Sequence, residues 1–203
     1  MRLRGFYFIT DSGLCRKSDQ DAVSAAVEGG CSVVQYREKN LTSRAMIHVA
    51  GRIREITRGR AVFLVNDRVG IAMAVDADGV HLGQEDTPLE DARRLLGKGK
   101  IIGVTVHNVV EAVAAKAAGA DYLAVSPIFQ TTTKADAGKP AGVQLIRDVK
   151  AAVDLPVAAI GGINEANVDQ VMAAGADMVC AISATVAKDD IKAAVEYFSR
   201  KFR

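Results

Sequence analysis

The chain has 203 residues, of which 49% are hydrophobic and 25% are charged, and its formal net charge is +2. This composition is typical of a globular protein, and the length predicts one domain over residues 1–203. The small net charge, the 5% aromatic content and the lack of Trp argue against a nucleic-acid or membrane partner.

The sequence gives no sign of export. Its first apolar run, Phe6–Ile9, is too short for the core of a signal peptide, and no apolar segment approaches the length of a transmembrane helix. The cysteines Cys15, Cys31 and Cys180 are odd in number, and their spacing fits no zinc site or redox pair. We therefore expect reduced thiols in a cytoplasmic protein.

Short apolar runs recur along the whole chain and predict strands. Most of them are continuously apolar, as expected for parallel strands that are covered on both faces. The expected strands are Phe6–Thr10, Ser32–Tyr36, Val62–Asn66, Gly79–Leu82, Ile101–Thr105, Tyr122–Val125, Val157–Ile160 and Met178–Ile182.

Longer amphipathic segments separate these runs. In residues 45–56 and 191–202, apolar side chains recur three or four positions apart, which is typical of a helix with one buried face. A strand followed by a helix, repeated along the chain as the runs above predict, gives the α/β fold of a (β/α)₈ TIM barrel. An open doubly wound sheet is the alternative.

An internal repeat favours the barrel. Residues 28–35, 118–125 and 174–181 resemble one another, residues 75–81 are a weaker copy, and each copy precedes an even-numbered expected strand. The glycines of these copies suit the left-handed residue that ends a helix, so we interpret them as structural.

The active site of such a barrel lies at the C-terminal ends of its strands, so the residues after each run are the candidates. These residues are rich in cations, hydroxyls, carboxylates and glycines. They are Gln35–Lys39, Asn66–Asp67, Gly83–Asp86, Thr105–Asn108, Ser126–Lys134, Gly161–Gly162 and Ile182–Ser183.

Asp67 and Asp86 lie on successive strand–helix units, so the fold could bring their carboxylates together. Two carboxylates with phosphate oxygens of a substrate are a common way to hold Mg²⁺. The alternative is that each Asp caps the helical run that follows it. We expect an enzyme that uses Mg²⁺ and acts on a phosphorylated or pyrophosphorylated substrate.

Anion-binding residues follow the other strands. Gly161–Gly162 and Ile182–Ser183 stand where barrels commonly bind phosphate, although a tight turn without a ligand would use the same glycines. Arg37, Lys39 and Lys134 could clamp a second, more highly charged group, while any one of them alone would suit a solvated loop.

The three histidines suggest different roles. His107 lies at the expected rim beside Thr105, where a neutral imidazole could act as an acid or a base. His81 lies inside an expected strand and suits a hydrogen-bonded core position, and His48 suits a helix surface.

Together the motifs resemble the thiamine-phosphate synthase family. They are Tyr7–Asp11, Gln35–Lys39, Asn66–Arg68, Gly79–Asp86, Pro127–Phe129, Thr131–Lys134 and Ile160–Ile163, in order over nearly the whole chain. The resemblance implies a transferase of thiamine biosynthesis. That family couples 4-amino-2-methyl-5-(diphosphooxymethyl)pyrimidine with thiazole phosphate and releases thiamine phosphate and pyrophosphate.

The resemblance also implies roles for individual residues. Thr105 keeps the hydroxyl of the usual Ser, Thr132 stands where Lys is often found, and Tyr36 replaces an aliphatic residue of the pocket wall. Arg37, Lys39, Thr105 and Lys134 would be catalytic, and Asp67 and Asp86 would hold Mg²⁺. The pyrimidine pyrophosphate would contact Gln35, Tyr36, Arg37, Glu38, Lys39, Asn66, Thr105 and Lys134, and the thiazole phosphate would contact Thr131, Thr132, Thr133, Gly162, Ile182 and Ser183.

The implied mechanism is dissociative: pyrophosphate leaves first, the thiazole nitrogen then attacks the pyrimidinylmethyl cation, and the loop Thr131–Lys139 closes over the site. The expected partners are these small molecules. Assembly into a homo-oligomer is an open alternative. One alternative is the thiazole tautomerase of the same superfamily, with His107 in its active site. Another is a barrel that binds phosphate without catalysis.

Overall fold

Eight parallel strands form a closed barrel, in which β1 is hydrogen-bonded to both β2 and β8. The structure is a computed structural model that describes residues 3–133 and 138–202. The closure confirms the (β/α)₈ prediction and excludes an open doubly wound sheet. The strands are β1 Gly5–Ile9, β2 Val33–Tyr36, β3 Val62–Asn66, β4 Gly79–Leu82, β5 Ile101–Val106, β6 Tyr122–Val125, β7 Val157–Ile160 and β8 Met178–Cys180.

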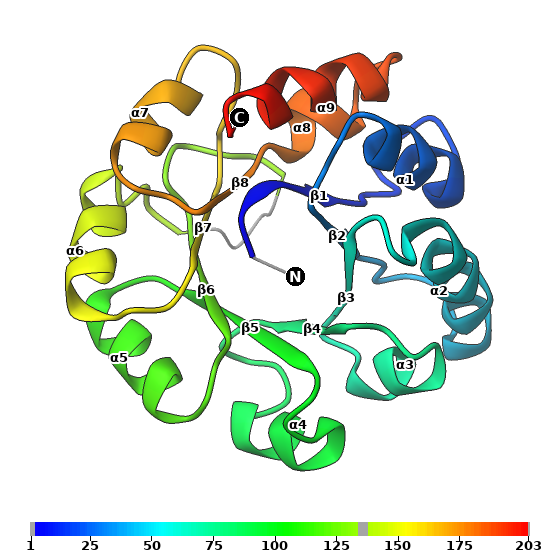
Figure 1. The fold of residues 1–203 in the computed structure, drawn as a ribbon, viewed down its shortest axis with the longest axis horizontal. Coiled ribbons are helices and arrows are strands. Elements are labelled where there is room, and N and C mark those ends of the chain that lie inside the picture. The colour runs from blue at the N-terminus through cyan, green and yellow to red at the C-terminus, as the bar shows by residue number, and fades with distance from the viewer. Residues whose placement is uncertain (1–2, 134–137, 203) are drawn as a thin grey trace.

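Helices form a ring around the barrel (Figure 1). Within the described residues, no helix is both long enough and apolar enough to cross a membrane. The helices are α1 Asp19–Glu28, α2 Ser43–Thr57, α3 Val69–Ala74, α4 Leu89–Leu96, α5 Val109–Ala117, α6 Gln144–Ala152, α7 Val168–Ala173, α8 Ile182–Val186 and α9 Ile191–Arg200.

The buried side chains form two clusters, which fix the direction in which each strand residue points. Tyr7 and Ile9 of β1 belong to the cluster inside the barrel, whereas Phe6 and Phe8 belong to the larger cluster between barrel and helices. Leu3 packs against the inner cluster, and Figure 1 shows the N-terminal segment at the centre of the ring. Alternate residues of each strand therefore line the barrel interior.

The internal repeat has the conformation that the sequence predicts. Gly30, Gly119 and Gly175 have φ values of 84°, 92° and 95°, and Asp76 of the weaker copy has a φ of 51°. Each of them ends a helix in the left-handed region, which supports the structural interpretation of these glycines.

The repeat also carries a carboxylate that joins neighbouring strands at the end of the barrel opposite the predicted rim. The Asp121 carboxylate accepts the Ile102 N–H at 2.7 Å and pairs with Arg93 at 2.6 Å. Asp78 accepts the N–H of Phe63, and Asp177 accepts that of Val157, each with its own cation. The same bond between a carboxylate and a backbone N–H thus occurs in three copies of the repeat and links neighbouring strands. It lies at the face where barrels rarely place catalytic groups.

The last strand is shorter than predicted. β8 ends at Cys180, and Ile182 begins the additional helix α8, so the expected strand Met178–Ile182 was wrong at its end. The backbone leaves the strand at Ala181, whose carbonyl accepts the Thr185 hydroxyl at 2.8 Å in the first turn of α8. Ile182 and Ser183 thus stand at a helix start, a common place for phosphate in such barrels.

Candidate active site

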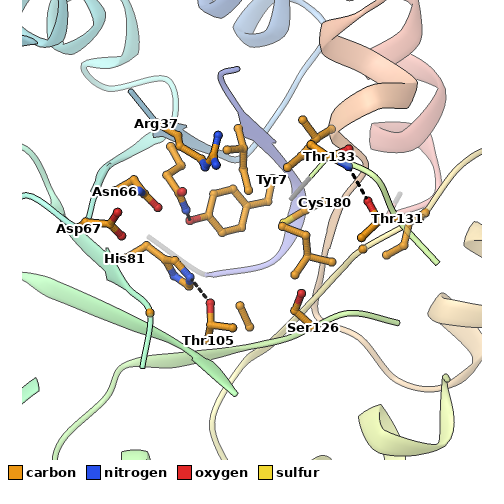
Figure 2. A pocket seen from close by; sticks show the side chains of 18 of the residues that line it. Tyr7, Arg37, Asn66, Asp67, His81, Thr105, Ser126, Thr131, Thr133 and Cys180 are labelled. Carbon is orange, nitrogen blue, oxygen red and sulfur yellow. Dashed lines mark hydrogen bonds between the residues drawn. The ribbon is translucent and has the colours of Figure 1, made fainter. Parts of the chain in front are cut away.

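A pocket opens at the C-terminal end of the barrel and receives residues from every strand. The empty volume of the pocket, counted together with its open mouth, is about 1050 Å³. Figure 2 shows polar side chains surrounding this pocket. The predicted site residues that line it are Gln35, Arg37, Lys39, Asn66, Asp67, Asp86, Thr105, Thr131, Thr133, Gly162, Ile182 and Ser183.

Asp67 and Asp86 meet at this rim, as predicted. Burial and the neighbouring Asp86 carboxylate raise the pKa of Asp67, and Lys39 partly opposes that rise. Asp67 has a φ of 59°, an uncommon conformation for a residue other than glycine. Its N–H donates to the His81 carbonyl at 2.9 Å, which fixes the backbone there. Asp67 is therefore held in an uncommon backbone conformation beside a second carboxylate.

The donor set fits Mg²⁺. Neither Asp caps the following helix, because the N-cap residues of α3 and α4 are Arg68 and Pro88. Within the described residues, no group of three or more His, Cys, Asp or Glu side chains could hold a metal ion. A cation at Asp67 and Asp86 would thus need water or substrate oxygens as further ligands, and Mg²⁺ is commonly bound in this way.

Two cations, Arg37 and Lys39, line the pocket, and each is paired with a carboxylate. The Lys39 ammonium lies 3.3 Å from Asp67 Oδ2. The Arg37 guanidinium is 3.1 Å from Asp11 Oδ2, and the other oxygen of Asp11 accepts the Gly13 N–H. Asp11 therefore holds Arg37 in place at the pocket wall, where its planar fork could bind phosphate oxygens.

The opposite side of the pocket is built from close backbone contacts. Gly161 and Gly162 have φ values of 103° and 64°. A Cβ atom on Gly162 would lie 2.3 Å from the Gln130 carbonyl oxygen, so only glycine fits there. The first residues of α8, Ile182 and Ser183, line the same side. Glycine and helix-start residues thus form this wall of the pocket, a combination that phosphate sites commonly use.

Comparisons with known proteins agree with this geometry. Residues 6–185 match the family model described as thiamine monophosphate synthase. The chain belongs to this family. It is 53% identical to a thiamine-phosphate synthase of Methanosarcina barkeri, over 95% of this chain and 88% of that protein. The corresponding identity to the Chloroflexus aurantiacus enzyme is 52%, over 93% and 88%.

A solved structure gives the same result. The thiamine phosphate pyrophosphorylase of Pyrococcus furiosus is 40% identical and superposes with a TM-score of 0.91, over 98% of this chain and 95% of that one. Like these relatives, the chain is a transferase of thiamine biosynthesis with thiamine-phosphate synthase activity. The comparisons give no support to the tautomerase or to a silent barrel.

Three residues that the family resemblance assigned to substrates lie elsewhere. Tyr36 is fully buried in the cluster between barrel and helices, because Gln35 takes the inward position of β2. Glu38 is buried beneath the loop and accepts hydrogen bonds from Ser12 Oγ and the Asn40 and Leu41 N–H groups. Thr132 is exposed and does not line the pocket. These three residues therefore do not line the pocket, and their contact with a substrate stays a prediction.

The loop after β6 is described only in part. Thr131 and Thr133 line the pocket, and the Thr133 N–H donates to Thr131 Oγ1 at 3.3 Å. Lys134, to which we assign a catalytic role, lies outside the described residues, and so does part of the expected lid.

His107 lies at the rim as predicted, but its surroundings suit a structural role. Its Nδ1 lies 3.0 Å from Glu111 Oε2, and the same oxygen accepts the His107 N–H at 2.8 Å. Burial raises the pKa of Glu111, but these contacts with His107 outweigh burial and leave the pKa below its usual value. The ring is thereby tied to the start of α5.

Sequence reasoning left out several pocket residues. Ser126, one of the rim candidates, lines the pocket, and so do Tyr7 and His81, to which no substrate contact was assigned (Figure 2). The signal that could have found them is strand alternation: Tyr7 and His81 occupy inward positions one layer below the rim. The prediction that His81 is a hydrogen-bonded core residue is confirmed, because its two ring nitrogens contact Tyr122 and Thr105.

Proposed function

We propose that this enzyme couples the pyrimidine pyrophosphate precursor of thiamine with thiazole phosphate and releases pyrophosphate. The observation that carries the proposal is the meeting of Asp67 and Asp86 beside Lys39, at the rim of a pocket whose far side offers backbone to an anion. A metal-assisted clamp for one highly charged group and a separate site for a phosphate match the two substrates. We place the enzyme in the cytoplasm.

Asp67 and Asp86 would hold Mg²⁺, and the ion when bound would neutralise charge on the pyrophosphate oxygens. Arg37 and Lys39 would add positive charge to the same group, and we assign Lys134 to it from the family resemblance. Asn66 lies at the end of β3 on the same side of the pocket. The pyrophosphate end of the substrate would thus meet cations on several sides.

The reaction breaks the bond between the pyrimidine methylene carbon and the pyrophosphate oxygen. The electron pair leaves with pyrophosphate, and the lone pair of the thiazole nitrogen forms the new carbon–nitrogen bond. The site suits this order of events because it is rich in groups that stabilise a leaving anion. The Cys180 thiol lines the pocket, but burial raises its pKa far above the usual value, so it is a poor nucleophile.

The thiazole phosphate would bind opposite, against Thr131, Thr133 and the backbone of Gly162, Ile182 and Ser183. The nearness of α8 to this side supports the assignment, since helix starts favour anions. With both substrates bound, the thiazole ring would lie between its phosphate site and the pyrimidine.

The test is incubation of the purified enzyme with both precursors, with and without Mg²⁺. We expect thiamine phosphate and pyrophosphate in equal amounts, and loss of both after chelation of the metal. Conversion of the thiazole phosphate alone, without pyrimidine and without metal, would instead identify a tautomerase.

A further inference from the structure

A continuous chain of hydrogen bonds crosses the barrel just below the pocket. Gln35 Nε2 donates to the Tyr7 hydroxyl at 2.6 Å, and the Tyr7 and Tyr122 hydroxyls are 2.8 Å apart. The Tyr122 hydroxyl lies 2.7 Å from His81 Nδ1, and His81 Nε2 lies 2.9 Å from Thr105 Oγ1. This hydrogen-bond chain joins β2 to β5 through side chains of β1, β6 and β4.

Every member of this hydrogen-bond chain lines the pocket except Tyr122, at its middle. Gln35 and Thr105 line the pocket, and Figure 2 shows the bond between His81 and Thr105 at its wall. Tyr122 is 0% exposed and is absent from the pocket lining. An effect of the Tyr122 hydroxyl on a ligand must therefore pass through its neighbours.

The barrel makes room for this buried link. His81 is in register with Gly103, and Gly103 is in register with Tyr122. A Cβ atom on Gly103 would lie 2.0 Å from Tyr122 Cζ and 2.4 Å from its hydroxyl oxygen. Glycine weakens a strand interior and often marks a close approach. Here it lets the Tyr122 ring cross β5 and reach His81.

The bond from Gln35 Nε2 to Tyr7 is compatible with one order of donors in which every proton along the hydrogen-bond chain has an acceptor. Gln35 donates to Tyr7, Tyr7 donates to Tyr122, and Tyr122 donates to His81 Nδ1. The His81 proton is then on Nε2 and is donated to Thr105 Oγ1. This order leaves Gln35 Oε1 as an acceptor and the Thr105 hydroxyl as a donor at the two ends.

Reversing the order is a concerted change. The Gln35 amide would have to turn over, so that its oxygen accepts from Tyr7, and the protons of both tyrosines and of His81 would have to move. Burial raises the pKa of both phenols far above the usual value, so they remain hydroxyls, each with one proton to donate. The direction of donation is therefore the same along the whole hydrogen-bond chain, and one member cannot reverse it alone.

We propose that Tyr7, Tyr122 and His81 are positioning residues that fix the hydrogen-bond direction of Gln35 and Thr105 and thereby select an aminopyrimidine. An aminopyrimidine presents an N–H donor beside a ring-nitrogen acceptor, which matches the acceptor of Gln35 and the donor of Thr105. The oxo analogue, with a carbonyl beside a ring N–H, presents the opposite pattern. This inference rests on the proposed function, because it takes Gln35 and Thr105 as contacts of the pyrimidine.

The test uses Tyr122→Phe, which removes one hydroxyl that cannot touch a ligand. kcat/KM would be measured for the aminopyrimidine pyrophosphate and for its oxo analogue, with thiazole phosphate saturating. We expect the preference for the amino substrate to fall about threefold to tenfold, as loss of one net hydrogen bond predicts. The change should lie in the pyrimidine parameters, and the KM for thiazole phosphate should stay at the wild-type value.

Two further variants sharpen the result. Tyr197→Phe removes a hydroxyl from α9, outside the pocket lining, and should leave the preference unchanged. In a Thr105→Val background the effect of Tyr122→Phe should be smaller, because one of the two groups that the hydrogen-bond chain orients is already absent and coupled residues are not additive. If Tyr122→Phe does not fold, Tyr7→Phe breaks the same chain and carries the same expectation.

The outcomes separate the two proposals. A folded, active Tyr122→Phe enzyme with the wild-type preference would overturn the positioning role and leave the proposed function intact. A wild-type enzyme that forms no thiamine phosphate from either pyrimidine would overturn both.

Discussion

Lys39 Nζ lies 3.3 Å from Asp67 Oδ2, so a cation of the loop after β2 is paired with a carboxylate that follows β3. Burial and the neighbouring Asp86 carboxylate raise the pKa of Asp67, and Lys39 offsets only part of that rise. The arrangement therefore suits a further cation at the carboxylates.

Replacing either Asp67 or Asp86 by Asn should reduce turnover by about 10²-fold or more, because each change removes a charged ligand where negative charge develops. Asn is the informative substitution at Asp67, since it tolerates the left-handed backbone that Ala would strain. The measurements are kcat as a function of Mg²⁺ and the thermal unfolding midpoint. Wild-type turnover at ordinary Mg²⁺ would remove that Asp from the metal site.

Gly162→Ala should raise the KM for thiazole phosphate about tenfold or more, a loss typical of hydrogen bonds to a charged group. The new Cβ would meet the Gln130 carbonyl and displace backbone at the phosphate side. Gly59→Ala is the matched control, because Gly59 also has a positive φ, of 72°, but no atom within 4 Å of the added Cβ. Equal effects of both variants on KM would show that backbone strain alone is responsible.

Much of the fold and part of the site could be predicted from the sequence. The apolar runs and the glycine repeat predict the order of the strands. The polar residues that follow the strands predict the residues of the rim. Gln35 lines the pocket and Tyr36 does not, because adjacent residues of a strand face opposite sides, which a contiguous motif does not record. The link from His81 to Tyr122 depends on register across β5 at Gly103, which no local pattern records.

Lys39→Ala should lower the coupling rate by about 10²–10³-fold, because a preorganised cation is lost as pyrophosphate leaves. His107→Ala should cost far less than the roughly 10²–10⁴-fold loss caused by removing a general acid or base. The ring of His107 is tied to Glu111, and a dissociative step needs no base there. Rates would be compared with both substrates saturating, and a dead His107→Ala beside an active Lys39→Ala would reverse these roles.

Tyr36→Phe should raise the free energy of unfolding by about 1 kcal/mol, because it removes a buried hydroxyl from an apolar site. Among the described residues this hydroxyl has no hydrogen-bond partner. Tyr122→Phe is the matched comparison and should lower the same free energy, since its hydroxyl contacts both Tyr7 and His81. Urea unfolding of the two variants measures both signs, and a destabilised Tyr36→Phe would contradict the assignment.

Asp19, at the start of α1, should make the stability of the protein depend on pH. Burial and the nearby Glu38 and Asp11 carboxylates raise the pKa of Asp19 to about 6. A carboxyl whose folded pKa is raised stabilises the fold when protonated. That contribution is fully present below the ordinary pKa of 3.8 and is lost as the pH rises through about 6.

Asp19→Asn should therefore stabilise the protein relative to wild type at pH 7.5 and lose that advantage by pH 4. The helix start favours a negative charge by about 0.3–1 kcal/mol, which opposes the gain, so we expect a net increase below about 1 kcal/mol. Urea unfolding midpoints of both proteins at pH 4, 6 and 7.5 measure the difference. A difference that does not grow with pH would mean that the carboxyl of Asp19 ionises in the folded protein as it does in the unfolded chain.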